Sequence, residues 1–306
     1  MRFILGFIGV VFAGILAISL ISSGLDYFNN PPEETAQHKL HKHPKDLHLA
    51  SDGAFGKFDN AQLQRGFQVY TEVCAACHAL ERVSFRDLHA LGYSEAEIKK
   101  IASDWKTQVP SINPDTGEVA GRKALPSDRF PSPFANETAA RAANNNAYPP
   151  DLSLITKSRE GGAAYIYSLL TGYQNQSPAL VKEFPDAKTP AGLHYNPYFA
   201  NLNIAMPPPL TSNGQVTYAD GTPATVDQMA KDVSAFLVWA GEPKLDSRRA
   251  SGLAVTIFLL IASILGYLAY RQTWHQVKRG VRVTGALDPE NQAKSRHAKA
   301  DAGIAG

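Results

Sequence analysis

The run Cys74-Ala75-Ala76-Cys77-His78 contains the only two cysteines of the 306-residue chain. The pattern C-x-x-C-H is typical of c-type haem attachment, in which two thiols bind the haem covalently and the adjacent histidine binds its iron. Residues three and four positions apart lie close together on a helix, so Cys74, Cys77 and His78 can all face one flat macrocycle. The motif therefore predicts a chain that folds around one covalently bound haem c.

Two other kinds of site use closely spaced cysteines, and we keep both as alternatives. A thioredoxin-like C-x-x-C follows a strand and does not need His78. A zinc site needs four ligands, to which other histidines would have to contribute. The histidines before the motif are His38, His41, His43 and His48. They occupy a polar, proline-containing stretch that is more typical of a solvated linker.

Two amphipathic segments predict helices. Apolar residues recur at steps of three and four from Leu63 to Cys77, which indicates a helix from about residue 61 to residue 79 with Asn60 as its N-cap. A second repeat predicts a helix over residues 223–240, which begins at a proline and ends before Gly241. Alternating strand patterns are few, so we expect an all-α fold. Residues 109–133 are rich in Pro, Ser, Gly and Asp and are expected to form a long surface loop.

An electron-carrying haem commonly has methionine as its second axial ligand. Beyond Met1 the chain has two candidates. Met229 falls within the second predicted helix and is expected to fill the core. Met206 lies in Ile-Ala-Met-Pro-Pro-Pro-Leu, where three prolines stiffen the backbone and suit a weak thioether ligand. We predict Met206 as the sixth iron ligand, with His194 as the alternative.

Residues 250–270 form an uncharged stretch of Leu, Ile, Val, Ala and Phe, long enough as a helix to cross about 30 Å of hydrocarbon. The basic residues that follow place residues 271–306 on the cytoplasmic side as a basic tail. Those in the first part of the tail are Arg271, Lys278, Arg279 and Arg282. The preceding body would then lie outside the cytoplasm, which agrees with attachment of c-type haem on the periplasmic side of bacterial membranes.

An apolar run from Phe3 to Ile21 follows Arg2, so residues 1–24 are expected to be a signal peptide or an N-terminal membrane anchor. Tolerable cleavage sites near residues 19 and 24 favour cleavage. Residues 25–58 are then a polar linker, and residues 59–246 are a periplasmic c-type cytochrome domain. Residues 49–246 carry 17 Lys and Arg against 21 Asp and Glu, whereas residues 247–306 carry 9 against 3. A mildly acidic body can steer a basic electron-transfer partner, and no nucleic acid partner is expected.

Beyond the haem motif, the chain resembles the cytochrome c1 family, the haem subunit of the cytochrome bc1 complex (ubiquinol–cytochrome c reductase), in its bacterial form. Five blocks carry the resemblance: RGFQVYTEVCAACH (65–78), AARAANNNAYPPDLS (139–153), YSLLTGY (167–173), NPYF with IAMPPPL (196–210), and DGTPAT with KDV, FL and WAGEP (220–243). Ala200-Asn201 departs from the family's frequent Pro-Gly. No cysteine is left for the extra disulfide of some bacterial members.

The resemblance implies an all-α c-type cytochrome domain with long loop insertions and one C-terminal transmembrane helix. It implies covalent attachment of haem at Cys74 and Cys77, with His78 and Met206 as the axial ligands of the iron. It also implies an ion pair between Arg159 and a haem propionate. The other haem-lining positions that it implies are Asn144, Ala147, Pro149, Pro150, Leu152, Ile155, Tyr165, Leu169, Leu170 and Phe199.

The role implied is one-electron relay in the respiratory chain. The Rieske iron–sulfur subunit would reduce this haem, and a cytochrome c would accept the electron. Quinol oxidation would occur on cytochrome b, so this chain belongs to a redox enzyme without making bonds itself. The implied location is the bacterial inner membrane. The alternative is a c-type haem carrier subunit of a terminal oxidase or denitrification enzyme, which would lack the 139–153 and 220–243 blocks.

Overall fold

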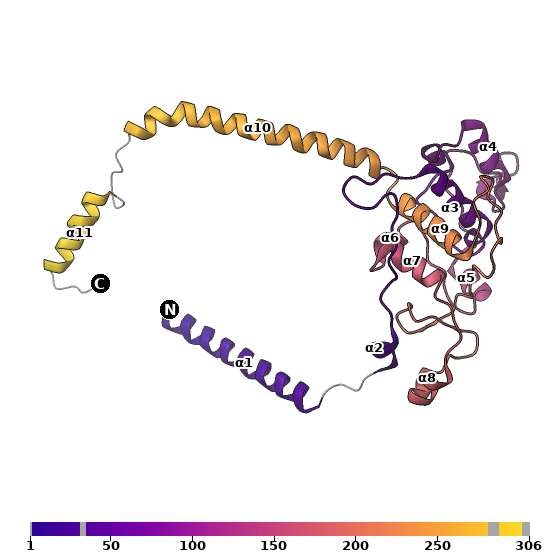
Figure 1. The fold of residues 1–306 in the computed structure, drawn as a ribbon, viewed down its shortest axis with the longest axis horizontal. Coiled ribbons are helices and arrows are strands. Elements are labelled where there is room, and N and C mark those ends of the chain that lie inside the picture. The colour runs from indigo at the N-terminus through magenta and orange to yellow at the C-terminus, as the bar shows by residue number, and fades with distance from the viewer. Residues whose placement is uncertain (1, 31–34, 281–287, 302–306) are drawn as a thin grey trace. The chain divides into compact units, whose positions relative to one another are not determined.

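The computed structural model describes residues 2–30, 35–280 and 288–301, and it divides into two units, residues 1–243 and residues 244–306 (Figure 1). Its helices confirm the predicted all-α class. They are α1 (Arg2–Asn29), α2 (Ala36–Leu40), α3 (Asn60–Glu72), α4 (Glu95–Asp104), α5 (Glu137–Ala143), α6 (Ile155–Ser158), α7 (Gly162–Leu170), α8 (Pro178–Glu183), α9 (Val226–Gly241), α10 (Leu245–Gly280) and α11 (Pro289–Asp301). Short 3-10 helices span Cys74–Ala76, Phe85–Leu91 and Pro185–Ala187.

Strands in the described residues form two small antiparallel pairs. β1 (Val109–Ile112) pairs with β2 (Val119–Arg122), and β3 (His194–Tyr195) pairs with β4 (Asn203–Ile204). The stretch 109–133, expected to be a surface loop, is therefore a hairpin for half its length. It also returns to the core, because Phe130 is fully buried against Phe85 with ring centroids 4.2 Å apart.

The core of the first unit is organised by the crossing of α3 and α9. Gly66 lies where the two helices meet: a Cβ there would stand 2.1 Å from the Asp232 carbonyl oxygen and 2.7 Å from the Phe236 Cβ. Only glycine permits so close an approach of two helix backbones. Phe67 packs next to the crossing, 5.6 Å from the Phe236 ring. Met229 on α9 is fully buried, which confirms its predicted place in the core.

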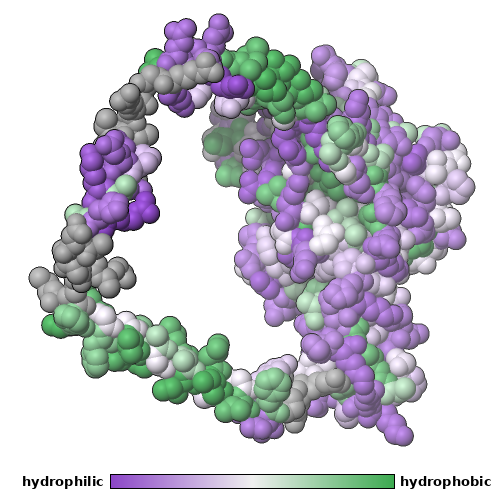
Figure 2. Space-filling model, turned by 60° about the vertical axis from the view of Figure 1, so that its left-hand side comes forward, coloured by the Kyte–Doolittle hydropathy of each residue, from purple (hydrophilic) through white to green (hydrophobic). Residues whose placement is uncertain are grey.

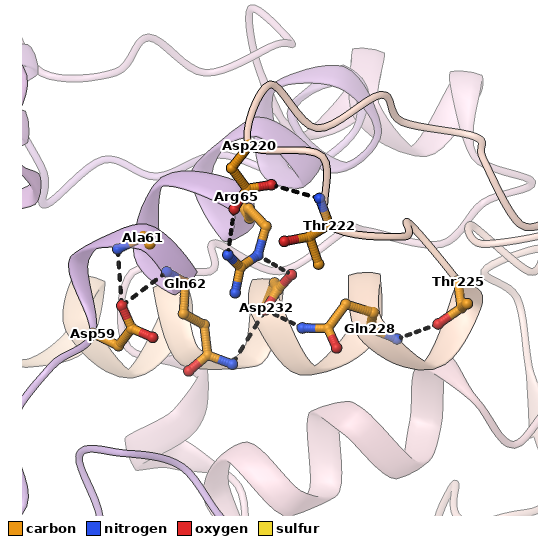
Figure 3. Close-up of polar contacts among 9 residues, drawn as sticks. All are labelled: Asp59, Ala61, Gln62, Arg65, Asp220, Thr222, Thr225, Gln228 and Asp232. Carbon is orange, nitrogen blue, oxygen red and sulfur yellow. Dashed lines mark hydrogen bonds and ion pairs between the residues drawn. The ribbon is translucent and has the colours of Figure 1, made fainter.

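A buried carboxylate also joins the two helices (Figure 3). Asp232 of α9 is fully buried and accepts hydrogen bonds from Arg65 Nε (2.9 Å), Gln62 Nε2 (3.2 Å) and Gln228 Nε2 (2.8 Å). Arg65 Nη1 reaches Asp220 at 2.7 Å, so the network ties the loop before α9 to α3. A buried charge needs such partners because its hydration is lost on folding.

The ends of both core helices differ from the prediction. Asp59, not Asn60, caps α3, because its carboxylate accepts from the Ala61 and Gln62 amides while Asn60 is already helical. α3 also ends at Glu72 rather than continuing through the motif to residue 79. The Val73 amide is shared between the Val69 and Tyr70 carbonyls, and this change to shorter-range bonding tightens the chain into a 3-10 turn. α9 begins at Val226, with Thr225 as its cap.

The segment expected to be a polar linker, residues 25–58, is only partly solvated. α1 runs on to Asn29, and Leu49 and Ser51 are buried. The Lys45 amide donates to Ser168 Oγ (2.8 Å), and its ammonium donates to Thr171 Oγ1 (2.7 Å). We call residues 36–58 the N-terminal arm. It differs from a free linker because its polar groups find partners on α7.

Within the described residues, two helices are long and apolar enough to cross a membrane. Residues 3–29 contain an 18-residue window with a mean hydropathy of 2.8, and residues 245–278 contain one with 2.3. Figure 2 shows hydrophobic side chains along both. The predicted span 250–270 lies inside α10, which agrees with the expected C-terminal transmembrane helix. The tail continues α10 to Gly280 and includes α11, while residues 281–287 and 302–306 lie outside the described residues.

Candidate haem site

The haem motif forms a closed turn directly after α3. The amides of Cys77 and His78 both donate to the Cys74 carbonyl, at 3.1 and 2.9 Å. Both cysteines are free thiols. Cys74 packs against the core, where burial raises the pKa of its thiol to about 12, and Cys77 is exposed. The turn, rather than a continuous helix, brings the three motif residues close together.

His78 is fixed at its ring and at its backbone. Its Nδ1 lies 2.8 Å from the Pro150 carbonyl oxygen, and a carbonyl only accepts, so Nδ1 carries the proton. This assignment leaves Nε2 with a lone pair, the form that binds a metal ion. The Tyr70 hydroxyl donates to the His78 carbonyl at 3.3 Å. Burial lowers the pKa of His78 and favours its neutral form, although the bond to Pro150 partly opposes this effect.

Pro150 reaches His78 because its segment runs beside the chain that follows the motif. The Leu152 amide donates to the Ala79 carbonyl (2.9 Å), and the Glu81 amide donates to the Asp151 carboxylate (2.8 Å). Pro149 and Pro150 stiffen the start of this segment. The Pro-Pro-Asp-Leu run therefore sets the orientation of the imidazole from about 70 residues away in sequence.

The predicted lining residues near the motif form part of one hydrophobic cluster with Cys74. Leu152 and Ile155 are buried in it, and Tyr165 and Leu170 of α7 pack against it. Burial raises the pKa of Tyr165, and the nearby charge of Arg159 opposes this rise. Arg159 is exposed, and within the described residues its guanidinium forms no ion pair. That arginine is available to a carboxylate of a bound group.

Met206 is half-buried and follows β4. The Tyr173 hydroxyl donates to its carbonyl at 3.1 Å. Phe199 is half-buried in the preceding turn, where its amide donates to the Asn196 carbonyl (3.1 Å). Asn196 in turn donates through Nδ2 to the Leu169 carbonyl at 2.8 Å. The segment with Met206 and Phe199 is thus attached to the C-terminal end of α7, the helix that carries Tyr165, Leu169 and Leu170.

The alternative ligand, His194, lies on β3 opposite Ile204 of β4, so the sheet brings it near the Met206 segment. His194 lines an open cavity of about 490 Å³ together with Tyr173 and Pro208. Asn144 and Ala147 are half-buried in the turn after α5, and Pro149 is half-buried beyond it. The neighbouring Asn145 donates to the Gly192 carbonyl at 3.2 Å, which joins this turn to the loop before β3.

These residues fit a covalently bound haem. A c-type haem requires groups for its vinyls, iron and propionates. The site offers two reduced thiols, a neutral imidazole with an unprotonated Nε2, and an arginine that forms no ion pair with any described residue. A thioredoxin-like site is excluded because α3, not a strand, precedes the motif. Across the part of the chain that the structure describes, no three His, Cys, Asp or Glu side chains gather as a metal site. Fold and site together define a c-type cytochrome with helices suited to membrane anchoring.

Comparison with known proteins specifies the family. Residues 49–277 match the model of the cytochrome C1 family, and the chain belongs to that family. Its proteins carry one covalently bound haem c, which is therefore the cofactor of this chain.

Three relatives are similar over most of the chain. "Cytochrome c1" of Rhodospirillum rubrum is 46% identical over 240 residues, covering 74% of this chain and 85% of the relative. The "Cytochrome b-c1 complex catalytic subunit, mitochondrial" of Candida albicans is 43% identical over 277 residues, covering 90% and 91%. "Cytochrome b/c1" of Bradyrhizobium diazoefficiens is 43% identical over 274 residues, covering 85% of this chain and 39% of the relative.

Several residues that shape the site were not predicted from the sequence. Tyr70 and Pro150 both bind His78. Tyr70 was expected on the helix face that meets the haem and Pro150 among the lining residues, but neither contact with His78 was predicted. Tyr173 and Asn196 hold the Met206 segment, and Lys45 holds the N-terminal arm against α7. Tyr173 and Asn196 lie within the blocks YSLLTGY and NPYF, which could have indicated that these residues matter for the fold. The blocks do not indicate which groups the two side chains bind.

Proposed function

We propose that this chain is the haem-bearing subunit of a cytochrome bc1 complex and relays single electrons from a Rieske iron–sulfur subunit to a cytochrome c. The observation that carries the proposal is the His78 site: two free thiols beside an imidazole whose Nδ1 is bound to Pro150, in a chain of the cytochrome c1 family. One relative is named as a subunit of the cytochrome b-c1 complex, and the name of another, "Cytochrome b/c1", joins cytochrome b to c1. Cytochrome b is therefore the partner expected beside this chain.

Cys74 and Cys77 would hold the haem, and His78 and Met206 would bind its iron. Arg159 would pair with a propionate, and the predicted lining residues already described would form the walls. The haem supplies a reversible one-electron iron couple when bound. The chain's own residues hold its ligands and limit water, so no general acid or base is required.

The haem domain lies on the periplasmic side of a bacterial inner membrane, and α10 is the anchor. Arg271 and Lys278 follow the apolar part of α10, and an excess of Lys and Arg after a span is typical of the cytoplasmic side. The exposed α1 would export the domain whether or not it is later removed. The mildly acidic surface favours a basic acceptor protein.

Met206→Leu in the full chain tests the site, with Met229→Leu as the matched control. The first should keep haem attached through both thiols while the reduction potential falls by an amount on the order of 0.1 V, because a ligand that raises the potential is lost. The second changes a fully buried core methionine that is not among the predicted haem residues, and it should leave the potential unchanged. Equal potentials in the two variants would exclude Met206 as a ligand.

Purification of the full chain from membranes tests the proposed partners. After solubilisation in mild detergent, an affinity tag on this chain should retain a b-type cytochrome and an iron–sulfur protein. Retention of a terminal oxidase or a denitrification enzyme, without a b-type cytochrome, would instead support the alternative carrier.

A further inference from the structure

The backbone of Met206 makes a single hydrogen bond within the described part of the chain. Its carbonyl accepts from the Tyr173 hydroxyl at 3.1 Å. The residues that follow are Pro207, Pro208 and Pro209, which have no amide hydrogen to donate. The ligand segment is therefore stiff along its length, but it is attached to the rest of the domain at few points.

Tyr173 is itself held in place by the turn after α7. Gly172 is buried, and a Cβ there would lie 2.4 Å from the Tyr198 ring and 2.6 Å from the Ser168 carbonyl oxygen. The turn is thus packed too closely to shift or to accept a side chain. Because Gly172 fixes the position from which the next side chain emerges, the Tyr173 ring has little freedom at its base.

The segment before Met206 contains a strained residue, so its backbone must be held in place. Leu202 has φ +65°, a left-handed conformation that costs an L-residue about 1 kcal/mol or more. Its side chain is buried, and its carbonyl accepts from the Asn196 amide at 2.8 Å. Strain of this kind persists only where neighbouring residues hold the chain. After β4, the next hydrogen bond that holds the chain is the one from the Tyr173 hydroxyl to the Met206 carbonyl.

We propose that Tyr173 is a positioning residue for Met206: its hydroxyl holds the Met206 carbonyl so that the thioether stays directed at the haem iron. This inference rests on the proposed role of Met206 as the sixth ligand. A thioether is a weak neutral ligand, so the fraction of haem that it ligates depends on how well the protein holds it. The open cavity of about 490 Å³ beside Tyr173 and Pro208 provides space into which an untethered segment can move.

The phenol is suited to this task at all physiological pH values. Tyr173 is half-buried, and burial raises its pKa further above the usual tyrosine value, so it remains a donor. Tyr195 offers a matched control. It lines the same cavity and is buried, and its hydroxyl forms no hydrogen bond to a described residue.

The experiment compares Tyr173→Phe, Tyr195→Phe, Met206→Leu and the unchanged chain, all full-length and at equal haem content. Three properties report ligation directly: the thioether-to-iron charge-transfer band of the oxidised haem, the pH at which this band disappears, and carbon monoxide binding to the reduced haem. Loss of one neutral hydrogen bond should raise the unligated fraction about three- to tenfold in Tyr173→Phe, with a matching increase in carbon monoxide binding. The band should also disappear about half to one pH unit lower.

Tyr195→Phe should behave like the unchanged chain. Wild-type behaviour of Tyr173→Phe, or an equal loss in both tyrosine variants, would overturn the specific role of Tyr173. If Met206→Leu keeps the band and excludes carbon monoxide, the assignment of Met206 fails first, so failure of the ligand proposal is separate from failure of the positioning proposal.

Discussion

Replacement of Asp232 by leucine should severely weaken the packing of α3 on α9. The carboxylate is fully buried, and three donors would lose their acceptor: Arg65 Nε, Gln62 Nε2 and Gln228 Nε2. Each buried donor without an acceptor costs about 1–3 kcal/mol, but Arg65 keeps Asp220 and has 15% of its side chain exposed. The expected loss is about 3–5 kcal/mol, a large part of the roughly 5–15 kcal/mol that stabilises a typical domain.

Urea unfolding of the detergent-solubilised chain measures this loss. Trp105 and Trp239 lie in or against the core of the first unit, so their fluorescence reports the unfolding of that core. Asp220→Asn is the matched control, because it alters the other carboxylate of the same arginine. Asp220 is 40% exposed, and exposed ion pairs contribute at most about 1 kcal/mol.

A second variant separates charge burial from lost hydrogen bonds. Arg65→Met combined with Asp232→Leu removes both buried charges and should recover part of the loss, leaving about 2 kcal/mol for the two glutamine amides. The reasoning is refuted if Asp232→Leu costs no more than Asp220→Asn, since the buried network would then contribute nothing beyond a surface ion pair.

Two further outcomes test the arm and the hairpin. Lys45→Ala removes the bond to Thr171 Oγ1 (2.7 Å) and the ammonium that stands 5.4 Å from the Tyr198 ring, so amide exchange of residues 41–49 should rise about tenfold, whereas Lys42→Ala should leave it unchanged. The Arg122 guanidinium lowers the pKa of Asp128, so this pair stabilises fully above the ordinary aspartate pKa and its contribution is lost as pH falls through the lowered value. Asp128→Asn should flatten the stability profile between about pH 5 and pH 3, and an unchanged profile would contradict the role of the pair.

The sequence was informative where a pattern is local. The haem motif, the α10 span and the place of Met229 in the core all depend on spacing or composition within one segment, and the structure agrees with each expectation that it tests. The boundaries of α3 were missed at both ends. Asp59 and Asn60 are both good caps, and the choice between them depends on where the backbone enters the helix.

The N-terminal arm could not be predicted because its partners lie far along the chain. Lys45 follows three histidines and a proline, a composition typical of a solvated segment, yet its partner Thr171 is 126 residues away. The contact of Tyr173 could not be predicted for the same reason, since its hydrogen-bond partner Met206 lies 33 residues further along the chain. Neither contact leaves a periodic pattern, because each joins one side chain to one carbonyl or hydroxyl group.

The end of α7 explains why these distant contacts converge. The last carbonyls of a helix have no intrahelical donor and must find one elsewhere. The Leu169 carbonyl accepts from Asn196 (2.8 Å), and the Thr171 carbonyl accepts from the Lys45 ammonium (3.3 Å), whose charge also suits the negative end of the helix dipole. The C-terminal end of α7 therefore binds both the N-terminal arm, through Lys45, and the turn before Met206, through Asn196. It follows that disturbance of the arm should reach the Met206 segment through α7, whereas disturbance of the α3–α9 crossing should first affect the Cys74 side.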